Sequence, residues 1–192
     1  LLNFVAVIND PHDSAAMYGL LAGDIYQLNL HSLVDLSSKA HRERVSLERY
    51  LKELGETDSK ISEALEAIAQ YRDFASELSA GQLLYKFIHE QGYLGSLLDG
   101  AEENSASARK IQNIAQFFGL IREFESVSLD PTIYHLWSYV SEMRASEADI
   151  LAADSPLDQN VVRIMTVHKA KGLEFEAVFV VNLVSDVFPS RR

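Results

Sequence analysis

A short polar cluster near the end of the chain contains residue types that could do chemistry. It lies between two apolar runs, at positions 161–167 and 177–184, and consists of Thr166, His168, Lys169, Lys171, Gly172 and Glu174. Hydroxyl groups, amides and lysine ammonium groups suit phosphate oxygens. A carboxylate accepts hydrogen bonds from sugar hydroxyls, as it does in dinucleotide sites. The cluster therefore predicts contacts with phosphate groups and with a sugar.

The two apolar runs that flank this cluster are predicted to be buried strands. Both are rich in Val, Ile and Phe, which is typical of strands covered on both faces in a parallel sheet. Thr166 and His168 are two positions apart, so on a strand they would share one face. They would lie at its carboxyl end, where open α/β sheets bind ligands. Gly172 falls in the connection, where the backbone must turn or approach a ligand closely.

The polar cluster and its surroundings resemble a known helicase motif. The stretch MTVHKAKGLEF at positions 165–175, followed by an apolar strand and Phe188-Pro189, is similar to motif V of the UvrD/Rep-type superfamily 1 DNA helicases. This family includes PcrA and the RecB/AddA-type recombination enzymes. Its motif V lies in the second RecA-like motor domain, between the track for single-stranded DNA and the ATP cleft. An ordinary strand–turn–strand with surface lysines is the alternative interpretation.

The resemblance implies a role for each residue of the cluster. It implies that Thr166, His168 and Lys169 face DNA. It also implies that Lys171, Gly172 and Glu174 lie toward the nucleotide, with Glu174 near the ribose.

The first 21 residues are predicted to form two helices that are separated at Asp10-Pro11. Pro11 suits the first position of a helix, and Asp10, just before it, can cap the free amides of the first turn. Asp13 would then lie favourably in the first turn. This pattern resembles the family segment in which a motor-domain helix ends at Asn-Pro-x-Asp and the chain enters a helical insertion.

The middle of the chain is predicted to be mostly helical. Residues 58–78 and 105–125 have apolar residues near helical spacing, and Pro131 opens a further helix. Residues 79–82 form a capping-box signature that opens a helix at 83–89, which Gln91-Gly92 ends. The apolar positions expected to face the core in the first of these segments are Ile61, Leu65, Ile68, Ala69, Phe74 and Leu78. Residues 145–160 are small and acidic, and we interpret them as a connection.

These elements predict a mainly α protein with a small α/β (RecA-like) fragment at its C-terminal end. We expect the end of a motor-domain (2A) helix at residues 1–9 and a helical 2B insertion at residues 10–158. A partial RecA-like 2A domain that carries motif V would follow at residues 159–192.

Composition excludes several classes of protein. The 192 residues can hold one domain with a full core, or one domain plus a fragment of another, and 47% of them are hydrophobic. No apolar run has the length of a membrane span, and no secretory signal is evident. Cysteine is absent, which excludes disulfide scaffolds and fits a cytoplasmic protein. The six histidines lack metal-ligand spacing, so no metal site is expected.

The net charge of −11 is unevenly distributed. Residues 1–160 contain 12 basic and 25 acidic groups, for −13, and residues 161–192 contain five basic and three acidic groups, for +2. One basic cluster interrupts the acidic part, at Lys39, Arg42, Arg44, Arg49 and Lys52. This cluster either touches duplex phosphates or forms a solvated face.

The chain contains no motif that could hydrolyse ATP by itself. It has no Gly-x-x-x-x-Gly-Lys-Ser/Thr loop for phosphates and no acidic pair after a strand for magnesium. The resemblance would place both before residue 1, and the phosphate-sensing arginine of the last motif after Arg192. No catalytic residue is therefore assigned here. ATP and Mg²⁺ are expected in the full-length enzyme, and neither is expected to be bound by this chain alone.

Three functional hypotheses follow. In the first, the chain is part of an ATP-dependent DNA helicase that acts on single-stranded DNA and on junctions of single- and double-stranded DNA in repair or recombination. In the second, the acidic helical part is a regulatory module that binds protein partners. In the third, the chain belongs to a RecB/AddA-type helicase–nuclease. No membrane association is expected.

Overall fold

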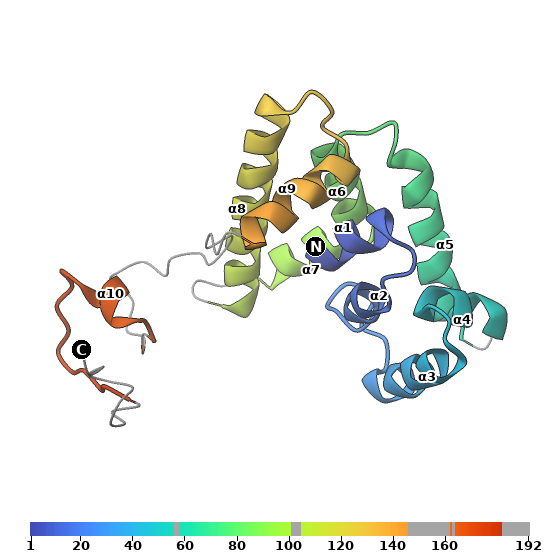
Figure 1. Cartoon of the computed structure of the whole chain (residues 1–192), viewed down its shortest axis with the longest axis horizontal. Helices are drawn as coiled ribbons and strands as arrows, with labels where there is room; N and C mark the ends of the chain where they lie inside the picture. The colour runs from blue at the N-terminus through green and yellow to red at the C-terminus, as the bar shows by residue number, and fades with distance from the viewer. Residues whose placement is uncertain (56–57, 101–104, 146–161, 163, 182–192) are drawn as a thin grey trace. The chain divides into compact units, whose positions relative to one another are not determined.

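The computed structural model describes residues 1–55, 58–100, 105–145, 162 and 164–181. The chain divides into two compact units, Leu1–Ala153 and Asp154–Arg192. The first unit is a bundle of helices around one hydrophobic core, and the described residues of the second unit contain one short helix (Figure 1). The expected connection at residues 145–160 lies almost entirely outside the described residues.

The described part of the first unit is helical. Its helices are α1 (Leu2–Asn9), α2 (Ser14–Leu21), α3 (Leu30–Glu43), α4 (Leu47–Leu54), α5 (Ser59–Phe74), α6 (Ala80–Glu90), α7 (Tyr93–Asp99), α8 (Ala106–Val127) and α9 (Ile133–Ala145). The mainly α class is confirmed. The helices expected within residues 58–78 and 105–125 and after Pro131 correspond to α5, α8 and α9.

The start of α2 differs from the sequence prediction in its cap. Asp13 is the N-cap, and its Oδ1 accepts a hydrogen bond from the amide of Ala16 at 2.8 Å. Asp10 instead accepts from the amide of His12 at 2.8 Å, and its carbonyl accepts from the amide of Asp13 at 3.2 Å. Asp10 thus closes a turn that contains Pro11. The predicted cap at Asp10 was wrong because this turn separates Pro11 from the first helical residue.

The start of α6 confirms the predicted capping box. The amide of Ser79 donates to Oε1 of Gln82 at 3.0 Å, and the amide of Gln82 donates to Oγ of Ser79 at 3.4 Å. Glu125 of α8 adds a tertiary contact, since its Oε1 accepts from Oγ of Ser79 at 2.6 Å and from the amide of Gly81 at 2.9 Å. The end of the helix is also confirmed, with Gly92 at φ +66°.

Helix α1 lies inside the core of the first unit. Phe4, Val5 and Val7 are fully buried, and α1 contacts α2, α5 and α9. The ring of Phe4 stacks on Phe87 of α6, with 3.8 Å between ring centroids and 11° between planes. The ring of Tyr71 lies nearly perpendicular to both, with its centroid 5.6 Å from that of Phe4 and 5.4 Å from that of Phe87. One aromatic cluster therefore ties α1, α5 and α6 together.

A buried ionic cluster joins α1, α4 and α5. Nη1 and Nη2 of Arg72 each donate to a carboxylate oxygen of Glu48 at 2.6 Å, and Nη2 also donates to the carbonyl of Val7 at 2.8 Å. Lys52 donates to Glu48 at 2.8 Å. The Glu48 side chain is only 5% exposed and that of Arg72 is 19% exposed. We call Glu48, Arg72 and the Val7 carbonyl the clasp.

Part of the buried face predicted for α5 was wrong, because the helix is rotated about its axis relative to the prediction. Leu65 and Ile68 are buried as expected, but Ala69 and Phe74 are exposed. The buried face of the helix runs instead through residues 64, 65, 68, 71 and 75. Tyr71 takes the inward position because its ring completes the aromatic cluster with Phe4 and Phe87.

The second unit does not show the expected α/β fragment. Its described residues contain α10 (Val167–Ala170) and no strand. Val162 and Phe179, which were expected in buried strands, are 95% and 90% exposed. A strand is stable only when neighbouring strands satisfy its backbone and cover its side chains. No described residue does this for positions 162 or 177–181, so the predicted strands are not confirmed. Positions 161, 163, 182–184 and 188–189 lie outside the described residues.

Candidate functional site

The polar cluster is built on a single helical turn. The amide of Ala170 donates to the carbonyl of Thr166 at 3.0 Å, which closes α10. The amides of Lys171 and Leu173 then donate to the carbonyls of His168 and Ala170 at 3.3 and 3.1 Å. Thr166 precedes the helix and His168 lies within it. The sequence had predicted that these two residues share one face of a strand, and the described structure does not show this.

Gly172 reverses the chain immediately after this turn. Its φ of +84° belongs to a conformation that glycine adopts without strain and that side chains disfavour. A Cβ at this position would meet nothing within 4 Å, so the backbone angle is the reason for glycine here. The turn expected at this position from the sequence is confirmed.

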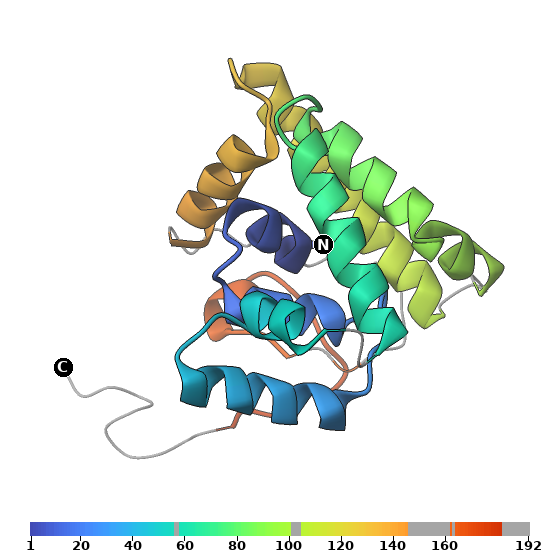
Figure 2. The same cartoon turned by 90° about the vertical axis from the view of Figure 1, so that its right-hand side faces the viewer.

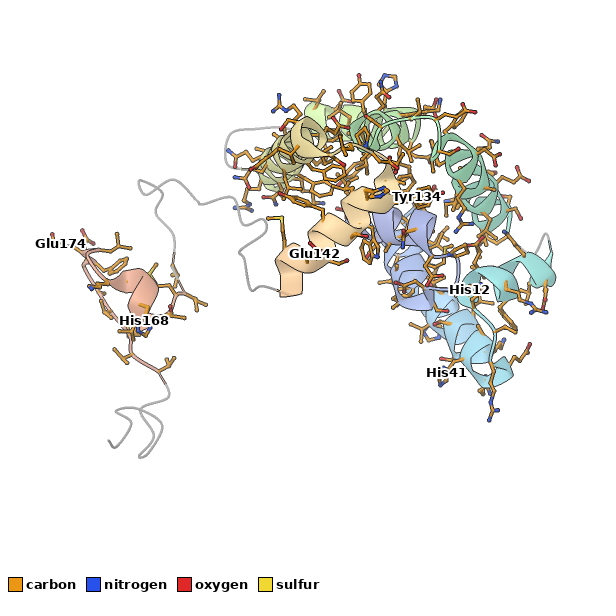
Figure 3. The ribbon with its side chains drawn as sticks, turned by 45° about the horizontal axis from the view of Figure 1, so that its top comes forward. His12, His41, Tyr134, Glu142, His168 and Glu174 are labelled. Atoms are coloured by element: carbon orange, nitrogen blue, oxygen red, sulfur yellow. The ribbon has the colours of Figure 1, made fainter. Side chains whose placement is uncertain are left out.

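The side chains of the cluster face solvent. Thr166, His168, Lys171 and Glu174 are exposed. Neither Lys171 nor Glu174 forms a salt bridge with any residue that the structure describes. His168 and Glu174 do not point toward each other (Figure 3). The structure therefore presents separate polar groups along one short segment. The side chain of Lys169 is not among the described parts of the structure.

The basic cluster of residues 39–52 lies on α3 and α4, and most of its charge is neutralised. Lys39 pairs with Asp35 at 2.7 Å and Arg49 with Glu53 at 2.7 Å, while Lys52 joins Glu48. Arg42 and Arg44 form no salt bridge with a described residue. Only two of the five cations are left for phosphates, which favours the interpretation as a solvated face.

A groove in the first unit was not found from the sequence. It has a volume of about 460 Å³ and lies among α1, α2, α7 and α8. At its edge Lys110 pairs with Asp24 at 2.6 Å, and the hydroxyl of Tyr93 donates to Asp24 at 3.3 Å. The hydrogen bond from Lys110 is the main reason why the pKa of Asp24 lies below its ordinary value. These residues are far apart in the sequence, so no local signal joins them.

Neither a metal-binding group nor a membrane-spanning helix is found in the part of the chain that the structure describes. There, no three His, Cys, Asp or Glu side chains come together in a way that could hold a metal ion. None of the helices in the same residues combines the length and apolar character needed to cross a membrane.

Comparison with known proteins defines the class of this chain. The model of the UvrD-like helicase C-terminal domain matches residues 3–192, and the chain therefore belongs to this family. This result confirms the UvrD/Rep-type resemblance seen in the polar cluster.

Three individual relatives are named as ATP-dependent helicase/nuclease subunits. The chain is 25% identical over 187 residues to an ATP-dependent helicase/nuclease subunit of Ruminiclostridium cellulolyticum, covering 93% of the chain and 14% of the relative. It is 27% identical over 186 residues to the protein of the same name from Oceanobacillus iheyensis, with coverage of 93% and 14%. For the Bacillus mycoides protein the identity is 28% over 196 residues, with coverage of 95% and 15%. The chain thus spans about one seventh of the length of these relatives.

Proposed function

We propose that the chain is part of an ATP-dependent DNA helicase that couples ATP hydrolysis to translocation on single-stranded DNA and to unwinding in repair or recombination. The observation that carries this proposal is the family match over residues 3–192. The names of the relatives support an ATP-dependent helicase associated with a nuclease. In the whole enzyme, ATP and Mg²⁺ would be bound mainly by residues outside this chain.

Within this proposal, the polar cluster links DNA to nucleotide. Thr166, His168 and Lys169 contact the backbone of single-stranded DNA. Lys171, Gly172 and Glu174 lie on the nucleotide side. Hydroxyl, imidazole and ammonium donors suit phosphate oxygens. The exposure of Thr166, His168 and Lys171 supports this role, because these donors can reach a ligand without breaking the core.

The mechanism that we propose is a population shift. All six residues lie within nine consecutive positions around one turn. A change on the nucleotide side is therefore transmitted through very few backbone bonds. Nucleotide binding would favour one arrangement of the turn and thereby change how Thr166 and His168 hold DNA. A ligand shifts such an equilibrium only by its difference in affinity for the two arrangements.

Binding of single-stranded DNA to the 192-residue chain tests the DNA side. A fluorescent oligothymidylate should bind weakly, and the affinity should fall as salt rises, because phosphate contacts release counterions. Thr166→Ala and His168→Ala should each weaken binding by about 2- to 10-fold, the value of one hydrogen bond. Fluorescence anisotropy over a salt series measures this.

A matched histidine gives the control for that experiment. His12 is also exposed and lies in the first unit (Figure 3), so His12→Ala should leave DNA affinity unchanged. Equal losses in His12→Ala and His168→Ala would contradict the assigned DNA contact. Absence of binding at low salt would favour the second hypothesis, a helical protein-interaction module, which the charge of −13 on residues 1–160 also favours.

The nucleotide side is tested in the intact enzyme. Glu174→Gln should raise the ATP concentration needed for half-maximal hydrolysis by about tenfold or more, because a hydrogen bond to a charged group contributes about 1.5–3 kcal/mol. Glu176→Gln is the control, since Glu176 is also exposed and only two residues away. Steady-state ATPase assays measure both. An unchanged requirement in Glu174→Gln would remove the ribose assignment.

A further inference from the structure

Helices α5 and α6 pack against each other (Figure 2), and each of them carries an exposed aromatic ring. Phe74 at the end of α5 is 36% exposed, and Tyr85 of α6 is 54% exposed. Nζ of Lys86 lies 4.8 Å from the centroid of the Phe74 ring. The ring of Tyr85 stacks on His89, with 5.7 Å between centroids. We call Phe74, Tyr85 and His89 the aromatic platform. Exposed aromatic residues of this kind are enriched in protein interfaces.

An unneutralised row of carboxylates borders this platform. Glu63, Glu66 and Asp73 are exposed on α5, and the spacings of three and seven residues place them on one face of the helix. Glu77 follows in the turn after the helix. These four residues form the acidic stripe. From Glu63 to Asp73 it extends roughly 15 Å at 1.5 Å per residue.

The acidic stripe lacks the cations that pair with several other carboxylates of the first unit. Asp35, Glu48, Glu53 and Glu90 each pair with a lysine or arginine. No member of the stripe forms a salt bridge with any residue in the described part of the chain. Their negative charge is thus available to an external cation.

We propose that the aromatic platform and the acidic stripe together bind an arginine- or lysine-bearing segment of a partner protein. A guanidinium or ammonium group is attracted to an aromatic face, and more strongly where water is excluded. Carboxylates add paired hydrogen bonds to the same cation. The combination fits a cationic segment in both its apolar and its charged parts.

Charge argues against other occupants of this surface. Nucleic acid would place phosphates next to four carboxylates, and like charges at an interface are unfavourable. A second copy of this chain carries −11 and would be repelled as a whole. The carboxylates extend along a helix rather than around a point, and they form no metal-binding group. The inference stands apart from the proposed helicase function, since it rests on none of the residues assigned to DNA or nucleotide.

Binding of a fluorescent nona-arginine peptide to the 192-residue chain tests the proposal. Binding should weaken as salt rises. The double variant Phe74→Ala/Tyr85→Ala should reduce the affinity by about fivefold or more, given the strength of exposed cation–π contacts. Glu66→Gln/Asp73→Asn should reduce it by a similar factor, because it removes two exposed carboxylate–cation pairs, each contributing about 1.4- to 5-fold in affinity. All these positions are exposed, so circular dichroism should show unchanged helix content.

Two control variants remove the same charge and the same kind of ring from other helices. Tyr134 and Glu142 of α9 are exposed (Figure 3), as is Glu123 of α8. Glu123→Gln/Glu142→Gln and Tyr134→Ala should leave peptide affinity within about twofold. An equal loss in these controls would show nonspecific attraction and overturn the proposal. Binding of an oligothymidylate that is weakened by Phe74→Ala/Tyr85→Ala, or a dimer abolished by the same double variant, would overturn the assigned occupant.

Discussion

Arg72→Met should lower the free energy of unfolding of the first unit by about 3–5 kcal/mol, the usual effect of removing one partner from a buried ion pair. Glu48 is 5% exposed and receives two 2.6 Å hydrogen bonds from Arg72. Without them its carboxylate keeps only the bond from Lys52, whose side chain is half exposed. The carbonyl of Val7 would lose its donor from the same guanidinium.

Urea denaturation at pH 7, followed by circular dichroism, measures this effect. Arg122→Met is the control, because Arg122 is exposed on α8, and surface substitutions usually change stability by less than about 0.5 kcal/mol. Glu48→Met/Arg72→Met should recover a large part of the loss, since two apolar groups can replace a buried pair. Equal stabilities of Arg72→Met and Arg122→Met would contradict the role of the clasp.

The same clasp should make stability depend on pH in the acid range. Burial raises the pKa of Glu48, but the hydrogen bonds from Arg72 and Lys52 outweigh it and hold the pKa below its ordinary value of 4.5. The stabilisation is therefore present above pH 4.5 and is lost as pH falls through the lowered pKa. In Arg72→Met, burial would dominate and protonation would relieve the unpaired charge. The difference between wild type and variant should thus shrink on acidification.

Phe87→Ala should destabilise the first unit by about 3–5 kcal/mol, as expected for a large-to-small change that leaves a cavity. Phe87 is fully buried and its ring contacts Phe4, Tyr71 and Tyr26, at centroid distances of 3.8, 5.4 and 6.4 Å. The substitution removes the contact that holds α1 against α6. Because α1 lies in the core, the loss should reach the whole unit.

Thermal and urea unfolding compare this variant with two others. Phe87→Leu retains part of the volume and should lose less than Phe87→Ala. Tyr85→Ala is the matched control on the same helix, because its ring is exposed, and its effect should stay below about 1 kcal/mol. A Phe87→Ala protein as stable as Tyr85→Ala would show that the aromatic cluster does not hold α1 in place.

Local sequence signals predicted the ends of some helices correctly. The capping box at Ser79 and Gln82 and the stop at Gly92 involve groups at most a few residues apart, so their pattern is complete in the sequence. The cap of α2 was misassigned between two nearby aspartates, Asp10 and Asp13. Either can accept an amide hydrogen bond, and the turn at Pro11 decided which one meets the helix.

Apolar spacing predicted α5 but not its exact orientation. The prediction turned Phe74 and Ala69 inward, whereas the core takes Tyr71. A stripe of apolar residues on a helix covers a wide arc, and the neighbours choose which part of it is buried. The strands predicted around motif V depended on neighbours even more, because their hydrogen bonds must come from other segments.

The sequence by itself determined the residue types of the polar cluster, the glycine that reverses the chain at position 172, and membership of the UvrD-like helicase family. These features lie within short, contiguous stretches or in the order of residues along the chain. Only the tertiary structure decided that Arg72 joins Glu48 to Val7, that Lys110 meets Asp24, and that Phe74 faces solvent. The two contacts join residues far apart in the chain, and the exposure of Phe74 depends on which helices pack around it. Their pairing follows from how whole helices pack, which no local pattern specifies.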